Sequence, residues 1–383
     1  MASILHLGKY YPPDFGGIET VTEQLARGAA VAGHDVSVLC FNAGRGAPVV
    51  SVEDGVRVMR SIRRWVVASQ PLGFEYLSQA LRVGRTSEIV HLHWPNLLAA
   101  ACVFAFPVRC KIVLHWHSDI VDKGFLGYLT RPLVQALLRR ADVVIATSTN
   151  YAASSPDLRR HSRKVMISPI GIDDWTTRFS PDKPAPALPR MMSEWLMGRR
   201  VILAVGRLVP YKGFDVLIRA TWRLPADVVV VIVGDGPIRR QLAGLIANEQ
   251  LGDRVLLAGR LDETELRALL YRCTLFCLPS TERSEAFGVV MLEAMAAAVP
   301  IVATLIEGSG VPWVNQNGVT GINVAPNDET ALADACLQIL NSERLRSTFG
   351  TGARARFVQC FDSRVTLGQV LALYKQMTSH SAT

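Results

Sequence analysis

The first half of the chain alternates short apolar runs with segments of helical periodicity. Ser3 to Gly8 predicts a strand, and the apolar residues between Ile18 and Ala32 recur at the spacing of a helix that ends at Gly33. Asp35 to Phe41 predicts the next strand. This order of strand, glycine-rich turn, helix and strand predicts a βαβ unit, which requires a parallel sheet and a right-handed crossover. Further strands are expected at Glu88 to His93, Lys111 to His115, Asp142 to Thr147 and Lys164 to Ser168.

The second half repeats this alternation after a proline-rich break. Between Asp173 and Gly198 the periodicity is lost and four prolines lie close together, which predicts a linker. Because 383 residues exceed the roughly 250 at which single cores stop growing, we expect two doubly wound α/β domains, residues 1–180 and 190–361, facing across a cleft. The second-half strands are expected at Val201 to Gly206, Asp227 to Gly234, Arg254 to Gly259, Thr274 to Pro279 and Ile301 to Thr304, with helices from Phe214, Ile238, Glu263 and Gly288.

Composition excludes a disordered chain and gives no sign of secretion. Hydrophobic residues make up 49% and charged residues 19% of the sequence. The seven cysteines are scattered through apolar runs without a Cys-x2-Cys pair, as expected of reduced packing residues. The first residues lack a secretory signal, so we expect a cytoplasmic protein. The uncharged run from Ile89 to Val108 is interrupted by prolines and histidines and predicts a strand, a loop and a short buried helix.

The net charge of +8 belongs mainly to the first half. Residues 1–190 hold 22 Lys and Arg against 15 Asp and Glu. Two interpretations stay open: a surface that contacts an anionic inner membrane or a phosphate-bearing acceptor, and a solvated basic surface without a partner. No nucleic acid is expected, because no recognised binding module accompanies the charge.

Two loops at the ends of predicted strands suit phosphate. Gly16 and Gly17 precede a helix, where backbone N–H groups and the helix dipole can meet an anion; a tight turn that needs positive φ is the alternative. Arg207 and Lys212 follow the first strand of the second half. A guanidinium fork and an ammonium suit a departing diphosphate, whereas plain surface cations are the alternative.

Further turns and two acids complete the candidate donor site. Gly234 and the pair Arg260 and Leu261 follow strands and would place backbone groups near a sugar, phosphate or base, or form ordinary turns. Glu285 lies in a loop and Glu293 about two turns into the next helix, and both carboxylates can accept hydrogen bonds from hydroxyl groups. The alternative is a capping acid and a surface acid. The backbone amides expected beside them belong to Phe287, Gly288 and Val289.

Histidines mark the strand ends of the first half. His117 and Asp119 follow a predicted strand and can position an acceptor hydroxyl or support a reacting sugar, although a hydrogen-bonded structural histidine is the alternative. His91 and His93 repeat the alternation on a neighbouring strand. No third ligand joins them at metal spacing in the sequence, so no metal site is expected.

Together these motifs resemble glycosyltransferase family 4, the retaining enzymes of the GT-B fold, over nearly the whole chain. Residues 114–119 and 310–315 are more particularly similar to bacterial mannosyl- and rhamnosyltransferases of surface polysaccharide assembly. Ala298, where many relatives have Gly, and residues 307–310 depart from the family pattern. The positions that carry the resemblance are Gly16, Gly17, His117, residues 206–214, Glu285 and Glu293.

The resemblance implies two Rossmann-like domains, the first covered by a C-terminal helix within residues 362–383. It implies that Arg207 and Lys212 hold the donor diphosphate, with amides of Gly16 and Gly17 contributing, and that neither a metal nor another cofactor is needed. Main-chain atoms near residues 260–261 would then read the base.

The resemblance also assigns roles around the sugar. Glu285 would meet its 3- and 4-hydroxyls, Glu293 the ribose, His117 the region of the reacting carbon, and Asp119 the donor sugar or the acceptor. The mechanism usually proposed for the family is substitution on one face of the sugar, in which a phosphate oxygen takes the proton of the acceptor. No residue is an obvious carboxylate nucleophile for a double displacement.

The donor and acceptor are named from the resemblance alone. GDP-mannose is the expected donor, ahead of GDP-rhamnose and UDP-sugars, and the acceptor is a glycan or a polyprenyl-diphosphate-linked saccharide of surface polysaccharide or lipopolysaccharide synthesis. A nucleotide-sugar epimerase and a non-catalytic subunit that binds nucleotide sugar are the alternatives. A dehydrogenase is disfavoured because neither half has the dinucleotide fingerprint.

Overall fold

The chain folds into two compact units. A computed structural model describes residues 1–14, 16–42, 44, 47–67, 70–119, 124–178 and 188–379. The first unit comprises Met1–Gly171 and Ser363–Thr383, and the second comprises Ile172–Asp362. Within the described residues, no helix is long and apolar enough to cross a membrane. All seven cysteines are free thiols.

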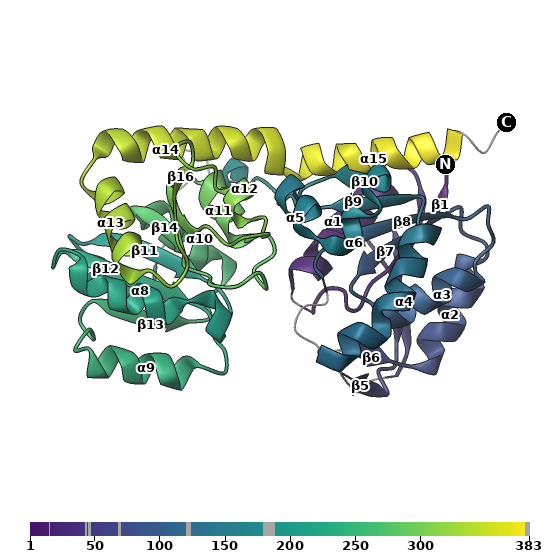
Figure 1. Cartoon of the computed structure of the whole chain (residues 1–383), viewed down its shortest axis with the longest axis horizontal. Helices are drawn as coiled ribbons and strands as arrows, with labels where there is room; N and C mark the ends of the chain where they lie inside the picture. The colour runs from purple at the N-terminus through teal and green to yellow at the C-terminus, as the bar shows by residue number, and fades with distance from the viewer. Residues whose placement is uncertain are drawn as a thin grey trace. The chain divides into compact units, whose positions relative to one another are not determined.

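The first unit contains an eight-stranded sheet in the order β10-β9-β8-β7-β1-β2-β4-β3 (Figure 1). Only the β3–β4 pair in this sheet is antiparallel. The sheet strands are β1 (Ser3–Leu7), β2 (Asp35–Phe41), β3 (Val49–Glu53), β4 (Val56–Ser61), β7 (Ile89–Trp94), β8 (Lys111–Trp116), β9 (Val143–Ala146) and β10 (Val165–Ile167), and β5 (Trp65–Val67) and β6 (Gln70–Leu72) form a separate ribbon.

Helices connect these strands and cover the sheet. Helix α15 comes from the end of the chain and packs against α1, and the two lie side by side in Figure 1. The helices are α1 (Gly17–Val31), α2 (Phe74–Gly84), α3 (Leu97–Cys102), α4 (Gly124–Arg140), α5 (Thr149–Ser154), α6 (Pro156–Arg159) and α15 (Ser363–Ser379), with 3₁₀ turns η1 (Val103–Ala105) and η2 (Ser162–Lys164).

The second unit contains a six-stranded parallel sheet in the order β13-β12-β11-β14-β15-β16. Strand β12 reads Val-Val-Val-Val-Ile-Val and is buried throughout, as expected of a strand covered on both faces. The order reverses between β11 and β14, so these neighbours form the topological switch point. The strands are β11 (Arg200–Val205), β12 (Val228–Val233), β13 (Val255–Gly259), β14 (Leu275–Leu278), β15 (Ile301–Thr304) and β16 (Gly321–Val324).

Helices α8, α9 and α13 share one buried apolar cluster with β11, β12 and β14. Right-handed crossovers from β13 to β14 and from β14 to β15 place α10 and α11 on the opposite face. The helices of this unit are α7 (Arg190–Leu196), α8 (Phe214–Ala220), α9 (Arg239–Asn248), α10 (Glu263–Arg272), α11 (Val290–Ala296), α12 (Val311–Val314), α13 (Glu329–Leu340) and α14 (Glu343–Arg356). Shorter turns are η3 (Trp175–Arg178), η4 (Pro210–Lys212), η5 (Thr221–Arg223) and the π-helical η6 (Phe357–Phe361).

The observed division differs from the predicted domain ends at 180 and 190. Ile172 forms a β-bridge with Asp362, and Asp174 accepts a hydrogen bond from Arg354 at 2.6 Å, so these contacts join the segment after Gly171 to the second unit. The segment predicted as a linker contains α7, and three of its four prolines lie outside the described residues. The predicted doubly wound α/β architecture is confirmed in both units.

Candidate active site

A buried ion pair lies at the switch point of the second unit. Nζ of Lys212, in the turn η4 after β11, is 2.5 Å from Oε2 of Glu285, in the loop after β14. Ser280 donates a second hydrogen bond to the same oxygen at 2.9 Å. Among the described residues no hydrogen bond is found to Oε1 of Glu285. An ammonium beside a carboxylate oxygen that is free to accept suits a ligand with both phosphate and hydroxyl groups.

The two loops that carry this ion pair are bonded to each other. The backbone N–H of Thr281 donates to the carbonyl of Tyr211 at 2.7 Å. Gly213 has φ 65°, and a Cβ at this position would lie 2.0 Å from the carbonyl oxygen of Pro279. Glycine is therefore required at Gly213, both for its left-handed backbone and for the close approach of the second loop.

A third loop fixes the backbone of Glu285. The Ser309 hydroxyl donates to the carbonyl of Glu285, and the N–H of Gly310 donates to the carbonyl of Ala286 at 2.8 Å. This loop is the 307–310 segment that departs from the family pattern. Its contacts show that these residues hold the backbone of the Glu285 turn, through the Ser309 hydroxyl and the Gly310 amide.

Glycines close the ends of β11, β12 and β13. Gly234 has φ 135°, and a Cβ there would lie 2.0 Å from the carbonyl oxygen of Gly206. Its N–H donates to the carbonyl of Gly259 at 2.7 Å. Arg239, which the sequence did not single out, donates from Nη2 to Leu257, while its buried Nη1 has no partner among the described residues. This unpaired N–H adds a candidate donor at the end of β13.

The other predicted cations lie near this edge and form no side-chain hydrogen bond within the part of the chain that the structure describes. Arg207 lies two residues after β11 and is exposed, and Arg260, after β13, is also exposed. Leu261 is partly buried. The structure thus brings Lys212 and Glu285 into contact, whereas the side chains of Arg207 and Arg260 form no hydrogen bond or ion pair with the described residues and stay available to a ligand.

Glu293 occupies a different environment from Glu285. It lies on α11 and is partly buried, and burial raises the pKa of its carboxyl to about 7, opposed by the positive charge of Arg267. Gly288 has φ 77°, and a Cβ there would lie 2.8 Å from the Leu278 side chain, so the turn before α11 requires glycine. The ring of Phe287 is buried, and Val289 is the residue immediately before α11.

The start of α1 in the first unit lies beside one of the helix's own acidic side chains and has no side-chain cap hydrogen bond among the described residues. A Cβ at Gly16 would lie 2.1 Å from Oε2 of Glu19. The pKa of Glu19 is raised, because burial outweighs the backbone hydrogen bond that it accepts. Gly16 is extended and Gly17 begins the helix, so the positive-φ alternative does not apply to either residue. The raised pKa means that burial disfavours a negative charge on Glu19, so this contact is not evidence for an anion site at the helix terminus.

His117 and Asp119 follow β8 but have different surroundings. His117 is 6% exposed, and Nε2 lies 3.1 Å from Nδ1 of His93. Oδ1 of Asp119 accepts hydrogen bonds from the Trp116 indole at 2.8 Å and from Ser155 at 2.9 Å. Those two bonds tie the carboxylate of Asp119 to the framework of the loop.

The sequence prediction that no third ligand accompanies His91 and His93 is wrong in three dimensions. His115, on the adjacent strand β8, brings a ring nitrogen within 4.8 Å of theirs. The third residue was missed because it comes from a neighbouring strand rather than from the same motif.

Comparisons with known proteins agree with this architecture. Residues 16–171 match the family described as glycosyl transferase 4-like domain, and residues 192–356 match glycosyl transferases group 1. The chain is 30% identical to O-antigen chain mannosyltransferase C of Escherichia coli, over 97% of each chain. It is 31% identical to a D-rhamnosyltransferase of Pseudomonas aeruginosa, over 94% of this chain and 92% of that one.

The fold is also found among solved structures. Sucrose-phosphate synthase from Thermosynechococcus elongatus superposes with a TM-score of 0.79 and 23% identity, over 99% of this chain and 100% of the other. This likeness supports the expected GT-B fold. With two family matches and two relatives that align over nearly their whole length, the chain belongs to glycosyltransferase family 4 and is a glycosyltransferase.

Proposed function

We propose that this enzyme transfers mannose, with retention of anomeric configuration, from GDP-mannose to a polyprenyl-diphosphate-linked saccharide during synthesis of a surface polysaccharide such as the O-antigen of lipopolysaccharide. The observation that carries the proposal is the Lys212–Glu285 pair at the switch point of the second unit. The names of the two relatives, a mannosyltransferase and a rhamnosyltransferase, support the sugar and the pathway.

The donor contacts follow from the chemistry of these side chains. Lys212 and Arg207 neutralise the diphosphate, and Arg207 is free to form a bidentate contact because its guanidinium forms no hydrogen bond or ion pair with the described residues. Oε1 of Glu285 accepts from sugar hydroxyls while Lys212 and Ser280 hold Oε2. Glu293 accepts from the ribose in its ionised form. Backbone groups of Gly234, the 260–261 turn and residues 287–289 surround the remaining donor atoms.

The reaction breaks the bond between the anomeric carbon and the leaving phosphate oxygen and forms one from that carbon to the acceptor oxygen on the same face. The acceptor proton passes to a phosphate oxygen. Lys212 and Arg207 stabilise the charge that develops on GDP as it leaves, which is the role that a divalent cation has in other transferases. His117 and Asp119 position the donor sugar and the acceptor, with the amides of Gly16 and Gly17 against the diphosphate.

The enzyme would act in the cytoplasm, with the first unit in peripheral contact with the membrane. Exposed Arg159, Arg160 and Arg163 support this contact. Arg140 and Lys164 do not, because Arg140 donates hydrogen bonds to carbonyls of the loop before β8 and Lys164 donates to three carbonyls at the end of α4. Lys164 therefore stabilises a helix terminus, and Arg140 stabilises the loop before β8.

Purified full-length enzyme tests the proposal. Thermal shift with GDP, UDP and dTDP should show the largest stabilisation with GDP, and GDP-mannose with a lipid-linked saccharide should yield GDP and a mannosylated product. Anomeric NMR of that product should show retention, and EDTA should leave the rate unchanged. Lys212→Ala should lower turnover by about 10²–10³, while Arg219→Ala, an exposed cation of the same unit, should not. An unchanged kcat/KM in Lys212→Ala, or a product that stays nucleotide-linked, would disprove the assignment.

A further inference from the structure

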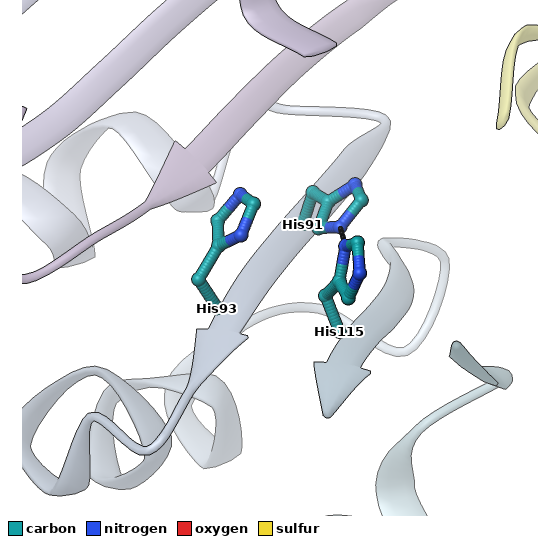
Figure 2. Close-up of side chains that lie close together, drawn as sticks. All are labelled: His91, His93 and His115. Carbon is teal, nitrogen blue, oxygen red and sulfur yellow. Dashed lines mark hydrogen bonds between the residues drawn. The ribbon is translucent and has the colours of Figure 1, made fainter. Parts of the chain in front are cut away.

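Five buried histidines lie on one face of the sheet in the first unit. Strand register places His6 of β1 beside His91 of β7, and His93 of β7 beside His115 of β8. Because side chains two residues apart on a strand share a face, His117 lies on this face as well. Each of the five side chains is at most 6% exposed. Figure 2 shows His91 and His93 on one strand and His115 on the next, with the bond between His91 and His115 drawn.

The histidines form two hydrogen-bonded rows. In the first row, Nδ1 of His6 lies 3.1 Å from Nε2 of His93, and Nδ1 of His93 lies 3.1 Å from Nε2 of His117. The ring centroids in this row are 5.5 and 5.4 Å apart, so the rings meet edge to edge, as an N–H···N bond requires. The second row runs from the hydroxyl of Tyr374, on α15, to His91 at 2.5 Å and on to His115 at 3.2 Å.

Hydrogen bonding explains these rings better than metal binding does. Both nitrogens of His93 and both nitrogens of His91 already face a partner, so of the group that approaches within 4.8 Å only His115 has a nitrogen without one. Binding of a metal ion would break several of these hydrogen bonds. The lone pairs of the ring nitrogens, which now face neighbouring rings, would also have to turn toward one common point. The hydrogen-bonded rows therefore describe the cluster.

Neutral histidines in a row allow only two arrangements of protons. Burial lowers the pKa of His6 and His117 to about 3 and that of His93 well below its usual value, so all three are neutral near pH 7. A neutral imidazole has one donor and one acceptor nitrogen. Either every Nδ1 in the row carries the proton, or every Nε2 does.

The ends of the row distinguish the two arrangements. Nε2 of His6 and Nδ1 of His117 are buried without a partner among the described residues. The first arrangement leaves the unpaired N–H at Nδ1 of His117, and the second leaves it at Nε2 of His6; both atoms are buried, but the residue His117 is 6% exposed whereas His6 is 0% exposed. Each arrangement also leaves one unsatisfied acceptor, and a buried orphaned N–H is the rarer of the two, so the arrangement that places the N–H on the partly exposed residue is favoured.

We propose that His6 and His93 are positioning residues that hold His117 as the Nδ1–H tautomer, so that His117 offers an N–H to an oxygen atom of the substrate. The tautomer follows from the row together with the residual exposure of His117. Only the identity of the oxygen, as part of the nucleotide-sugar donor or of its acceptor, rests on the proposed function.

Long-range ¹H–¹⁵N NMR of the full-length protein labelled with ¹⁵N-histidine tests the proposal. The free enzyme should show His117 protonated at Nδ1 and bare at Nε2. His93→Met removes the donor to Nε2, so the two nitrogens of His117 should shift towards a common averaged value. His93→Gln, which keeps a polar group of similar reach, provides a second variant if the apolar replacement unfolds. Tyr374→Phe is the matched control, because it removes the hydroxyl that bonds to His91 in the other row and should change His91 and His115 but not His117.

The outcomes separate this proposal from the proposed function. A wild-type His117 protonated at Nε2, a His117 pattern unchanged in both folded His93 variants, or stoichiometric binding of Zn²⁺ by the free enzyme would overturn it. With the predicted tautomer, kcat/KM should fall about tenfold in His93→Met, the scale of one lost hydrogen bond. If the tautomer changes as predicted and kcat/KM does not, the proposal stands and the assignment of His117 to the donor or acceptor fails.

Discussion

Replacing Lys212 and Glu285 one at a time and together measures how far the second unit depends on their contact. The two atoms are 2.5 Å apart and each side chain is 10% exposed. Removing one partner of a fully buried pair costs about 3–5 kcal/mol. Because Ser280 still donates to the carboxylate and some exposure remains, we expect Lys212→Met to lower the free energy of unfolding by about 2–3 kcal/mol.

The reciprocal change should cost less. Glu285→Gln keeps an oxygen that can accept from Lys212, so we expect a loss of about 1–2 kcal/mol. The double variant should lose less than the sum of the single variants, by about 1–2 kcal/mol, since neither charge is then left without its partner. The turnover of each single variant should fall by about 10²–10³ and the double variant should be no slower, because the two side chains act on one ligand.

Hydrogen exchange measured by mass spectrometry gives the stability of the second unit, because the amides of β11 and β14 report on that unit separately from the first. Arg219→Ala is the matched control: its exposed pair with Asp215 should contribute at most about 0.5 kcal/mol. Strictly additive losses in the double variant, or single variants whose exchange matches the control, would refute the argument that this pair is buried and coupled.

Three further changes test backbone and burial in the second unit. Gly213→Ala should cost more than about 2 kcal/mol and reduce turnover, because its Cβ would meet the carbonyl of Pro279; a thermal melt and an assay that match the wild type would contradict this. Ala298 has φ 57°, so Ala298→Gly should raise the free energy of unfolding by about 0.5–1 kcal/mol. This value is the strain relieved in the left-handed backbone minus the entropy that glycine adds to the unfolded chain. A lower melting temperature than that of the wild type would contradict it. Burial raises the pKa of the Glu293 carboxyl to about 7 in the folded chain, whereas the same carboxyl has its lower ordinary pKa in the unfolded chain. Between these two pKa values only the folded chain holds the proton, so the free energy of unfolding falls as the pH rises through that range. In urea unfolding, the stability of Glu293→Gln relative to the wild type should therefore increase by about 2 kcal/mol from pH 5 to pH 8. A difference in stability that does not change with pH would contradict the raised pKa of Glu293.

The regular elements were predictable where a long apolar pattern had a clear end. The strand from Asp35 to Phe41 is confirmed with the predicted bounds, and the helix from Glu263 is confirmed with the predicted start. The run from Ile89 contains β7, α3 and η1, as predicted for an interrupted apolar segment. The hairpin β3–β4 and the ribbon β5–β6 were not predicted, because β3 and β5 contain no fully buried position and show no clear period, although most of β4 is buried.

The candidate site was predicted as separate motifs rather than as contacts. Lys212 was expected at phosphate and Glu285 at a sugar, and the structure shows that they also bind each other. Ser280 and Ser309, which hold the carboxylate and backbone of Glu285, were missed because single serines in loops carry no pattern. Likewise His6 and Tyr374 join the histidine rows only through the arrangement of the strands and the last helix, which spacing along the chain does not reveal.

The contribution of α15 to the first unit has a consequence for synthesis. During translation the second unit is complete once Asp362 has left the ribosome, whereas the first unit still lacks the helix that brings Tyr374 to His91. The surface of the first unit that α15 covers therefore stays exposed while almost two hundred later residues leave the ribosome and fold. Removal of α15 would accordingly expose the first unit, which is synthesised first, and leave the second unit intact.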